Sequence, residues 1–235
     1  MIYLRSFLFV AAFYLWSAVL AITGTPLLLG PKRWTVSMFR VWANGIHLML
    51  RLICGIKVEV RGTQHLPKGP ALVAAKHQCM LDVFSQFAWL PASAFVMKKE
   101  LLWIPWFGWY ARKVGTVVID RSGGANTLRQ MVRETRELFA EGRQVVIFPE
   151  GTRGKPGVKG IYQPGVAGLY RDLEVPVYPV ATNSGVHWPA HGFLRHPGTI
   201  VFEYLEPIPA GLKRGEFMRI LEERIEAASM KLLSE

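Results

Sequence analysis

The chain of 235 residues contains only two cysteines, Cys54 and Cys79. Two cysteines are too few for a disulfide framework, and their spacing is not that of metal ligands, so we expect neither a disulfide-stabilised fold nor a zinc site. The sequence also has no internal repeats and no low-complexity tracts. A length of 235 residues allows one ordinary domain plus an appendage. Because no disulfide is implied, the reducing, cytoplasmic side is the expected location.

Acidic residues are also scarce, with 17 Asp and Glu against 28 Lys and Arg, which gives a net charge of +11. Basic charge alone fits nucleic acid or an anionic membrane surface. Here it accompanies 51% hydrophobic residues, 8 Trp and 13 Phe, and no recognised nucleic-acid-binding motif. We therefore expect the partner to be a phospholipid bilayer and not a nucleic acid.

The amino-terminal segment, residues 6–29, is uncharged and mostly apolar, with Arg5 before it and Lys32 and Arg33 after it. About 20 apolar residues can cross a bilayer core, so a transmembrane helix is physically possible. Pro26 is expected to break or kink the last part. A cleaved signal peptide is the less favoured interpretation, because the apolar run is too long for one.

The second hydrophobic segment, residues 35–56, has the pattern of an amphipathic helix interrupted by three basic side chains. Its apolar side would carry Phe39, Trp42, Ile46, Met49, Leu50 and Ile53. The two segments form either one span plus an interfacial helix or a hairpin within one leaflet. We expect residues 1–56 to anchor the chain to the membrane and residues 57–235 to form the catalytic domain.

Runs of β-forming residues alternate with helical patterns beyond residue 56, which predicts an α/β fold with a mixed central sheet flanked by helices. The expected helices cover residues 126–141 and 214–233, and Gly142 would end the first of them. The expected strands are 57–61, 70–75, 94–97, 114–119, 144–148, 175–181 and 199–204.

A histidine and an aspartate follow the second of these strands, His77 and Asp82. On a continuous helix the two side chains would lie roughly 140° apart, so they can meet only if a strand ends near Ala75 and a helix starts around Cys79 or Met80. A carboxylate on one ring nitrogen fixes the tautomer and leaves the other nitrogen free to take a proton. His77 could then act as a general base on a hydroxyl that the substrate supplies. The alternative is a strand-end histidine bonded to the backbone.

A second polar cluster follows the strand at 144–148. Gly151 permits an unusual backbone angle or the close approach of a ligand, and Thr152 offers a hydroxyl. Arg153 presents a planar fork of donors suited to a phosphate. Glu150 would either form a salt bridge with Arg153 or Lys76, or contact a substrate hydroxyl.

Three further features have two interpretations each. Asp120 and Arg121 end another strand and form either a surface ion pair or part of the same anion site. Lys98 or Lys99 could steer an anionic lipid or carrier. The tryptophan-rich residues 102–109 form a rim at the headgroup region, line an acyl groove, or pack in the core.

Together these motifs resemble the glycerolipid acyltransferase family, in particular its bacterial 1-acyl-sn-glycerol-3-phosphate acyltransferases. The matching blocks stand in the family's order: His77 and Asp82 for H-x4-D, 115–121 for G-x-x-x-I-D-R, 148–153 for F-P-E-G-T-R, and 175–180 for the fourth. The resemblance implies acyl transfer from a thioester of acyl carrier protein or coenzyme A to the 2-hydroxyl of lysophosphatidic acid, at the inner (cytoplasmic) membrane, with the catalytic domain on the cytoplasmic side. The product would be phosphatidate, with no metal or bound cofactor.

The resemblance also implies roles for single residues. His77 would be the base and Asp82 its orienting partner, while Lys98 matches the first lysine of a Lys-Lys-Glu-Leu motif. The glycerol phosphate would be bound by Arg121, Glu150, Gly151, Thr152 and Arg153. For the oxyanion we favour backbone amides near residues 78–80 at the helix start.

Departures from the family pattern leave alternatives open. Lys76 replaces a common Asn, Cys79 replaces Ser or Asn, and residues 161–165 lack the family's lysine before a glycine. The acceptor could therefore be another lyso-lipid, such as a lyso-ornithine lipid, or glycerol 3-phosphate. A non-enzymatic protein that binds anionic lipid is the rival from another class.

Overall fold

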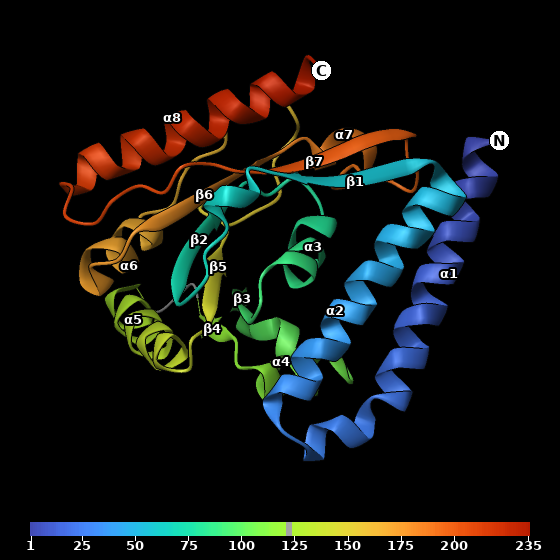
Figure 1. The fold of residues 1–235 in the computed structure, drawn as a ribbon, viewed down its shortest axis with the longest axis horizontal. Coiled ribbons are helices and arrows are strands. Elements are labelled where there is room, and N and C mark those ends of the chain that lie inside the picture. The colour runs from blue at the N-terminus through green and yellow to red at the C-terminus, as the bar shows by residue number, and fades with distance from the viewer. Residues whose placement is uncertain (121–123) are drawn as a thin grey trace.

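A mixed seven-stranded sheet forms the centre of the computed structural model, which describes residues 1–120 and 124–235 (Figure 1). The strand order across the sheet is β1-β7-β6-β2-β5-β3-β4. All the predicted strands are confirmed, although the fourth is shorter than expected because Val114 ends a helix. The strands are β1 Ile56–Arg61, β2 Ala71–Ala75, β3 Ser93–Lys98, β4 Val117–Ile119, β5 Gln144–Ile147, β6 Val177–Thr182 and β7 Gly198–Tyr204.

Five neighbouring strands, β6, β2, β5, β3 and β4, run parallel. Strand β7 is antiparallel to β6, and β1 pairs parallel with β7, so the expected mixed sheet is confirmed. The carboxyl ends of the five parallel strands share one edge of the sheet, which is where α/β proteins bind ligands. The turns after β2 and β5 therefore lie side by side.

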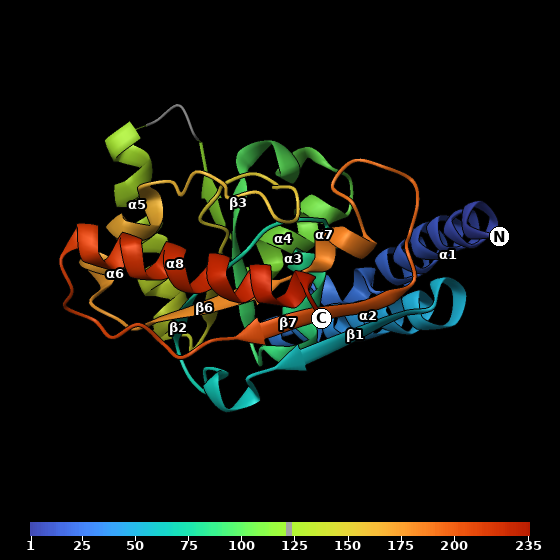
Figure 2. The same cartoon turned by 90° about the horizontal axis from the view of Figure 1, so that it is seen from above.

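Helices cover both faces of this sheet (Figure 2). Helices α5, α6 and α8 lie on one face, and α2, α3 and α4 on the other (Figure 1). The bounds are α1 Ile2–Thr23, α2 Lys32–Met49, α3 Leu81–Trp89, α4 Phe107–Val114, α5 Gly124–Ala140, α6 Gly165–Leu173, α7 Ser184–His187 and α8 Arg214–Leu233. Helices α4, α6 and α7 were not expected, because they are too short to show a helical period.

Strand β2 is buried on both faces, as its continuous apolar sequence requires in a parallel sheet. Leu72 and Ala74 belong to the apolar cluster under α5, α6 and α8. Val73 and Ala75 belong to the cluster that contains α2 and α3. Alternate residues of β2 thus pack in two different cores. The end of the strand, from which the chain continues to His77, is therefore fixed by packing on both faces of the sheet.

The first apolar segment forms α1, which ends at Thr23, and Pro26 lies in the short 3-10 turn that follows it. Within the described residues α1 is the one helix long and apolar enough to cross a membrane, with 17% of its most apolar window buried. It therefore fits a membrane-associating segment. Phe9 and Phe13 pack against Trp188 of the α/β domain.

The second segment forms α2 and a π-helical turn, Leu50–Cys54. Phe39, Ile46 and Leu50 are buried, so the predicted apolar side is confirmed. The tryptophans of the tryptophan-rich segment are not packed in the core, since Trp103, Trp106 and Trp109 are 80%, 41% and 52% exposed. Near the end of α8, Leu232 faces inward and Met230 is exposed.

Gly62, directly after β1, should be one of the least replaceable positions in the fold. Its φ is +65°, and an added Cβ would lie 2.0 Å from the carbonyl oxygen of Tyr204 in β7. We expect Gly62→Ala to lower the free energy of unfolding by roughly 1–3 kcal/mol, because both strain and backbone displacement are imposed.

The matched control is Gly69→Ala, since an added Cβ meets nothing within 4 Å there. Thermal unfolding of both variants in the same detergent checks this expectation. Equal midpoints for the two variants would contradict it.

Candidate active site

The histidine and the aspartate that the sequence singled out meet at the carboxyl end of β2. The strand ends at Ala75 and α3 begins at Leu81, so His77 lies in the turn between them. The His77 Nδ1 atom lies 3.1 Å from Oδ2 of Asp82. The His77 side chain is 15% exposed and that of Asp82 is fully buried. The break that the spacing of the pair required is confirmed.

Asp82 is held by several donors besides the imidazole. Its Oδ2 accepts the backbone N–H groups of Gln78, at 2.6 Å, and Cys79, at 2.7 Å. Its Oδ1 accepts the Ser184 hydroxyl, and the position in the first turn of α3 favours a negative charge. The carboxylate is therefore fixed before any substrate binds, and it orients the ring.

The imidazole ring stacks on Phe148, with ring centroids 4.2 Å apart. With Nδ1 directed at the carboxylate, the second nitrogen, Nε2, is the one left to act on a substrate. Among the residues that the structure describes, none forms a hydrogen bond with His77 Nε2. The ring is thus positioned by Asp82 on one side and Phe148 on its face.

Glu150 lies buried beneath this turn. Its Oε1 accepts Lys76 Nζ at 2.8 Å, and its Oε2 accepts the backbone N–H of His77 at 3.0 Å. An added Cβ at Gly160 would lie 2.4 Å from the same Oε1, so the loop packs directly on the carboxylate. The Lys76 salt bridge, which the sequence left as an alternative, is therefore present.

The other predicted binding residues lie at the same edge of the sheet. Gly151 has a φ of +65°, as the turn requires of a glycine, and Thr152 is exposed. Arg153 is exposed and its Nη1 donates to the carbonyl of Ala190 at 3.2 Å. Lys98 ends β3 with an exposed side chain. Arg121 lies outside the described residues.

Two of the backbone amides favoured for the oxyanion, among residues 78–80, are already in use. Those of Gln78 and Cys79 donate to Asp82, so a substrate oxygen cannot take them without displacing the carboxylate.

The Cys79 thiol is buried beside this pair, and burial together with the Asp82 carboxylate raises its pKa well above the usual value. A thiol held protonated is a poor nucleophile.

Two contacts of the pair were missed at the level of sequence. The stacking of Phe148 could have been suspected from its place in the second motif. Ser184 gave no signal, because it lies 102 positions from Asp82 and follows β6.

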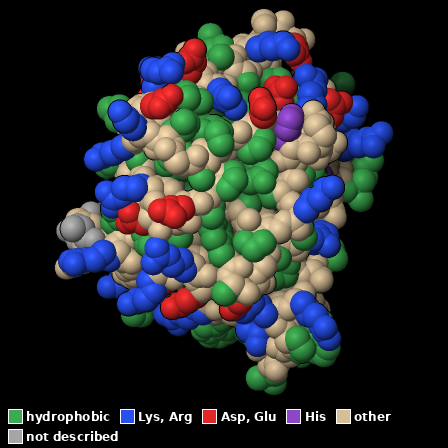
Figure 3. Space-filling view, turned by 60° about the vertical axis from the view of Figure 1, so that its left-hand side comes forward, with side chains coloured by type: hydrophobic (Ala, Val, Ile, Leu, Met, Phe, Trp, Pro, Cys, Tyr) green, Lys and Arg blue, Asp and Glu red, His purple; other side chains and the backbone are tan. Residues whose placement is uncertain are grey.

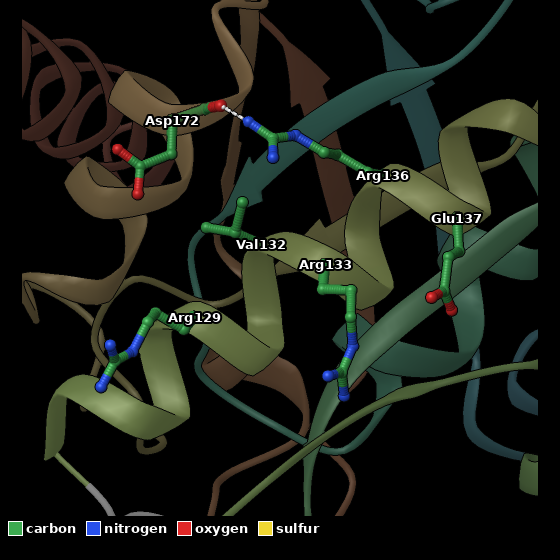
Figure 4. A pocket seen from close by; sticks show the side chains of 6 residues that line it. All are labelled: Arg129, Val132, Arg133, Arg136, Glu137 and Asp172. Atoms are coloured by element: carbon green, nitrogen blue, oxygen red, sulfur yellow. Dashed lines mark hydrogen bonds between the residues drawn. The ribbon is translucent and has the colours of Figure 1, made fainter.

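A surface hollow beside α5 is separate from this site (Figure 4). Arg136 there donates to the backbone carbonyl of Asp172. On the face that carries α5 and α6, basic and acidic side chains surround a central strip of hydrophobic side chains (Figure 3). None of the predicted site residues lines the hollow, which is bounded by Arg129, Val132, Arg133, Arg136, Glu137 and Asp172.

Comparison with solved structures identifies the fold. The crystal structure of the 1-acyl-sn-glycerophosphate (LPA) acyltransferase, PlsC, from Thermotoga maritima matches with a TM-score of 0.83. The match covers 100% of this chain and 99% of that chain, at 22% sequence identity. The two chains therefore share one fold over their whole length.

Comparison with curated sequences finds proteins called 1-acyl-sn-glycerol-3-phosphate acyltransferase. The one from Pseudomonas aeruginosa is 35% identical over 159 residues, 68% of this chain and 62% of its own length. The alpha form from Homo sapiens is 32% identical over 139 residues, 58% of this chain and 49% of its own length. The match thus spans less than two thirds of each of these relatives.

The sequence model of the family described as Acyltransferase matches residues 57–183, which is more than half of the chain. The matched region contains His77 and Asp82 and the turn that carries Glu150 to Arg153. The chain therefore belongs to the acyltransferase family.

Proposed function

We propose that the protein transfers a fatty acyl group from an acyl thioester to the sn-2 hydroxyl of 1-acylglycerol 3-phosphate, giving phosphatidate. The acyl donor would be a thioester of acyl carrier protein or coenzyme A. The observation that carries the proposal is the 3.1 Å contact between His77 and the buried Asp82. The names of the relatives from Pseudomonas aeruginosa and Homo sapiens support the same acceptor.

In the proposed reaction His77 Nε2 takes the proton of the sn-2 hydroxyl as its oxygen attacks the thioester carbonyl. Asp82 stabilises the imidazolium that forms. The tetrahedral intermediate then expels the thiolate, which takes the proton back from His77. Because a thioester is already activated, positioning and proton transfer are the main tasks, and no bound cofactor or metal is proposed.

The glycerol phosphate would bind at the carboxyl edge of the sheet beside His77. Arg153 and Thr152 are exposed there, and Lys98 ends the neighbouring β3. Their position supports a role in holding the phosphate, because guanidinium and hydroxyl groups match its oxygens. We assign Arg121 and Gly151 to the same subsite by their motifs.

We propose that α1 and α2 form a hairpin in one leaflet, with the catalytic domain on the cytoplasmic side of the inner membrane. Both ends of α1 contact the α/β domain. The backbone N–H of Arg195 donates to Ser6 Oγ at 2.9 Å, and the Tyr110 hydroxyl donates to the carbonyl of Ala21 at 2.7 Å. A helix that lies along the domain from end to end cannot cross the bilayer unless the domain enters it too. The exposed Trp103 would sit at the headgroups.

The acyl-transfer assay tests the central role of His77. We expect His77→Ala to lower transfer of labelled acyl groups to lysophosphatidic acid by about 10²–10⁴-fold, the contribution of a general base, while lipid binding is retained. The matched control is His65→Ala, because His65 lies in the turn between β1 and β2, away from the carboxyl edge. Equal activity of the wild type and His77→Ala would refute the role.

The same assay separates the acceptors when it is run in parallel with lysophosphatidic acid, a lyso-ornithine lipid and glycerol 3-phosphate. We expect the first to be the best substrate. Transfer confined to one of the other two would replace the acceptor in the proposal, and lipid binding with no transfer to any acceptor would favour the non-enzymatic alternative.

Thiol labelling tests the hairpin. Tyr3 is exposed near the amino-terminal end of α1, and both native cysteines are buried, so the background should be low. In sealed vesicles we expect an impermeant maleimide to label Tyr3→Cys from the same side as Glu223→Cys, an exposed position on α8. Labelling of the two positions from opposite sides would show that α1 crosses the membrane.

A further inference from the structure

A cluster of buried charges lies beneath the turn that carries His77. Lys76 Nζ donates to Glu150 Oε1 at 2.8 Å and to Glu226 Oε1 at 2.6 Å. The Lys76 and Glu150 side chains are each 2% exposed, and that of Glu226 is 17% exposed. The Tyr162 hydroxyl donates to the same Glu226 oxygen at 3.0 Å.

The cluster joins four separate segments of the chain. Lys76 follows β2, Glu150 follows β5, and Tyr162 precedes α6. Glu226 comes from α8, the carboxyl-terminal helix, which crosses the face of the sheet over β6 (Figure 2). These contacts tie α8 to the loop edge where the proposed chemistry takes place.

The charges of the cluster depend on one another. A buried ion costs several kcal/mol unless partners compensate it, and here one ammonium faces two carboxylates. Burial and the two carboxylates raise the pKa of the Tyr162 phenol, so it remains a hydrogen-bond donor to Glu226. Each member is therefore fixed by at least one other.

Glu226 differs from the other acidic residues on its side of α8. Glu222, one turn earlier, pairs with the exposed Lys159. Glu223 pairs with Arg219 on the helix surface, where both groups are largely exposed. Exposed pairs of this kind contribute little to stability. The Glu226 carboxylate is instead directed inward to Lys76.

We propose that Glu226 is a positioning residue for acyl transfer: it holds Lys76 against Glu150, whose second oxygen fixes the backbone N–H of His77. The inference rests on the proposed function. Through these contacts the carboxyl-terminal helix fixes the position of the His77 imidazole relative to the substrate hydroxyl. Small displacements of a general base have large effects on rate, because proton transfer depends on its geometry.

The test is the kcat and KM for lysophosphatidic acid of Glu226→Leu and Glu226→Gln in the full-length protein. We expect Glu226→Leu to lower kcat about tenfold with KM nearly unchanged, since the base is misplaced while the phosphate site is intact. Glu226→Gln keeps an acceptor oxygen for Lys76 and Tyr162, so its loss of kcat should be smaller.

The matched control is Glu222→Leu, which removes a carboxylate from the same helix but no contact to Lys76. It should retain the kcat of the wild type. Thermal unfolding of all three variants shows which of them is folded at the assay temperature. If Glu226→Leu is unfolded, the kcat of Glu226→Gln tests the inference.

Three results would overturn the inference: an unchanged kcat in the Glu226 variants, an equal loss in Glu222→Leu, or an effect on KM alone. Failure of the proposed function looks different. In that case the wild type and Glu222→Leu also fail to transfer acyl groups to lysophosphatidic acid.

Discussion

The site depends on the buried carboxylate of Asp82. It contacts the imidazole of His77, the backbone amides of Gln78 and Cys79, and the hydroxyl of Ser184. These donors come from the turn after β2 and from the start of α7, so one charge joins two loops and the first turn of α3. Because these donors are in place, the buried carboxylate has hydrogen-bond partners for both of its oxygens, and the histidine keeps one orientation.

The fold supplies this interaction through the parallel part of its sheet. Strand β2 is central and buried on both faces, so the turn after it starts from a fixed point. Strand β5 lies next to it and places Phe148 against the imidazole and Glu150 under the backbone of His77. Neighbouring parallel strands therefore deliver the ring, its stacking partner and its support to one edge.

Much of this arrangement could be predicted from local patterns. The apolar run before His77 predicts a strand that ends near Ala75. The spacing of His77 and Asp82 requires a helix to begin around Cys79 or Met80 if the two side chains are to meet, because five positions on one helix would separate them. Spacing alone left open whether they meet, and the structure shows that they do. The buried face of α8 follows from its helical period, with Phe217 and Leu221 inward.

The remaining features depend on contacts between distant parts of the chain. Ser184 reaches Asp82 across 102 positions, and Glu226 reaches Lys76 across 150. No local pattern encodes such pairs, since they depend on how the strands are ordered. The hydrogen bonds from the backbone amides of Gln78 and Cys79 to Asp82 could not be predicted either, because they depend on the conformation of the turn.

The proton-accepting role of His77 is tested most directly by the tautomer of its neutral ring, read from the nitrogen-15 chemical shifts. In the wild type a proton is expected on Nδ1, hydrogen-bonded to Asp82, with none on Nε2, and this preference should be lost in Asp82→Asn. A proton on Nε2 in the wild type would contradict this role, because His77 could not then accept the proton of the substrate hydroxyl.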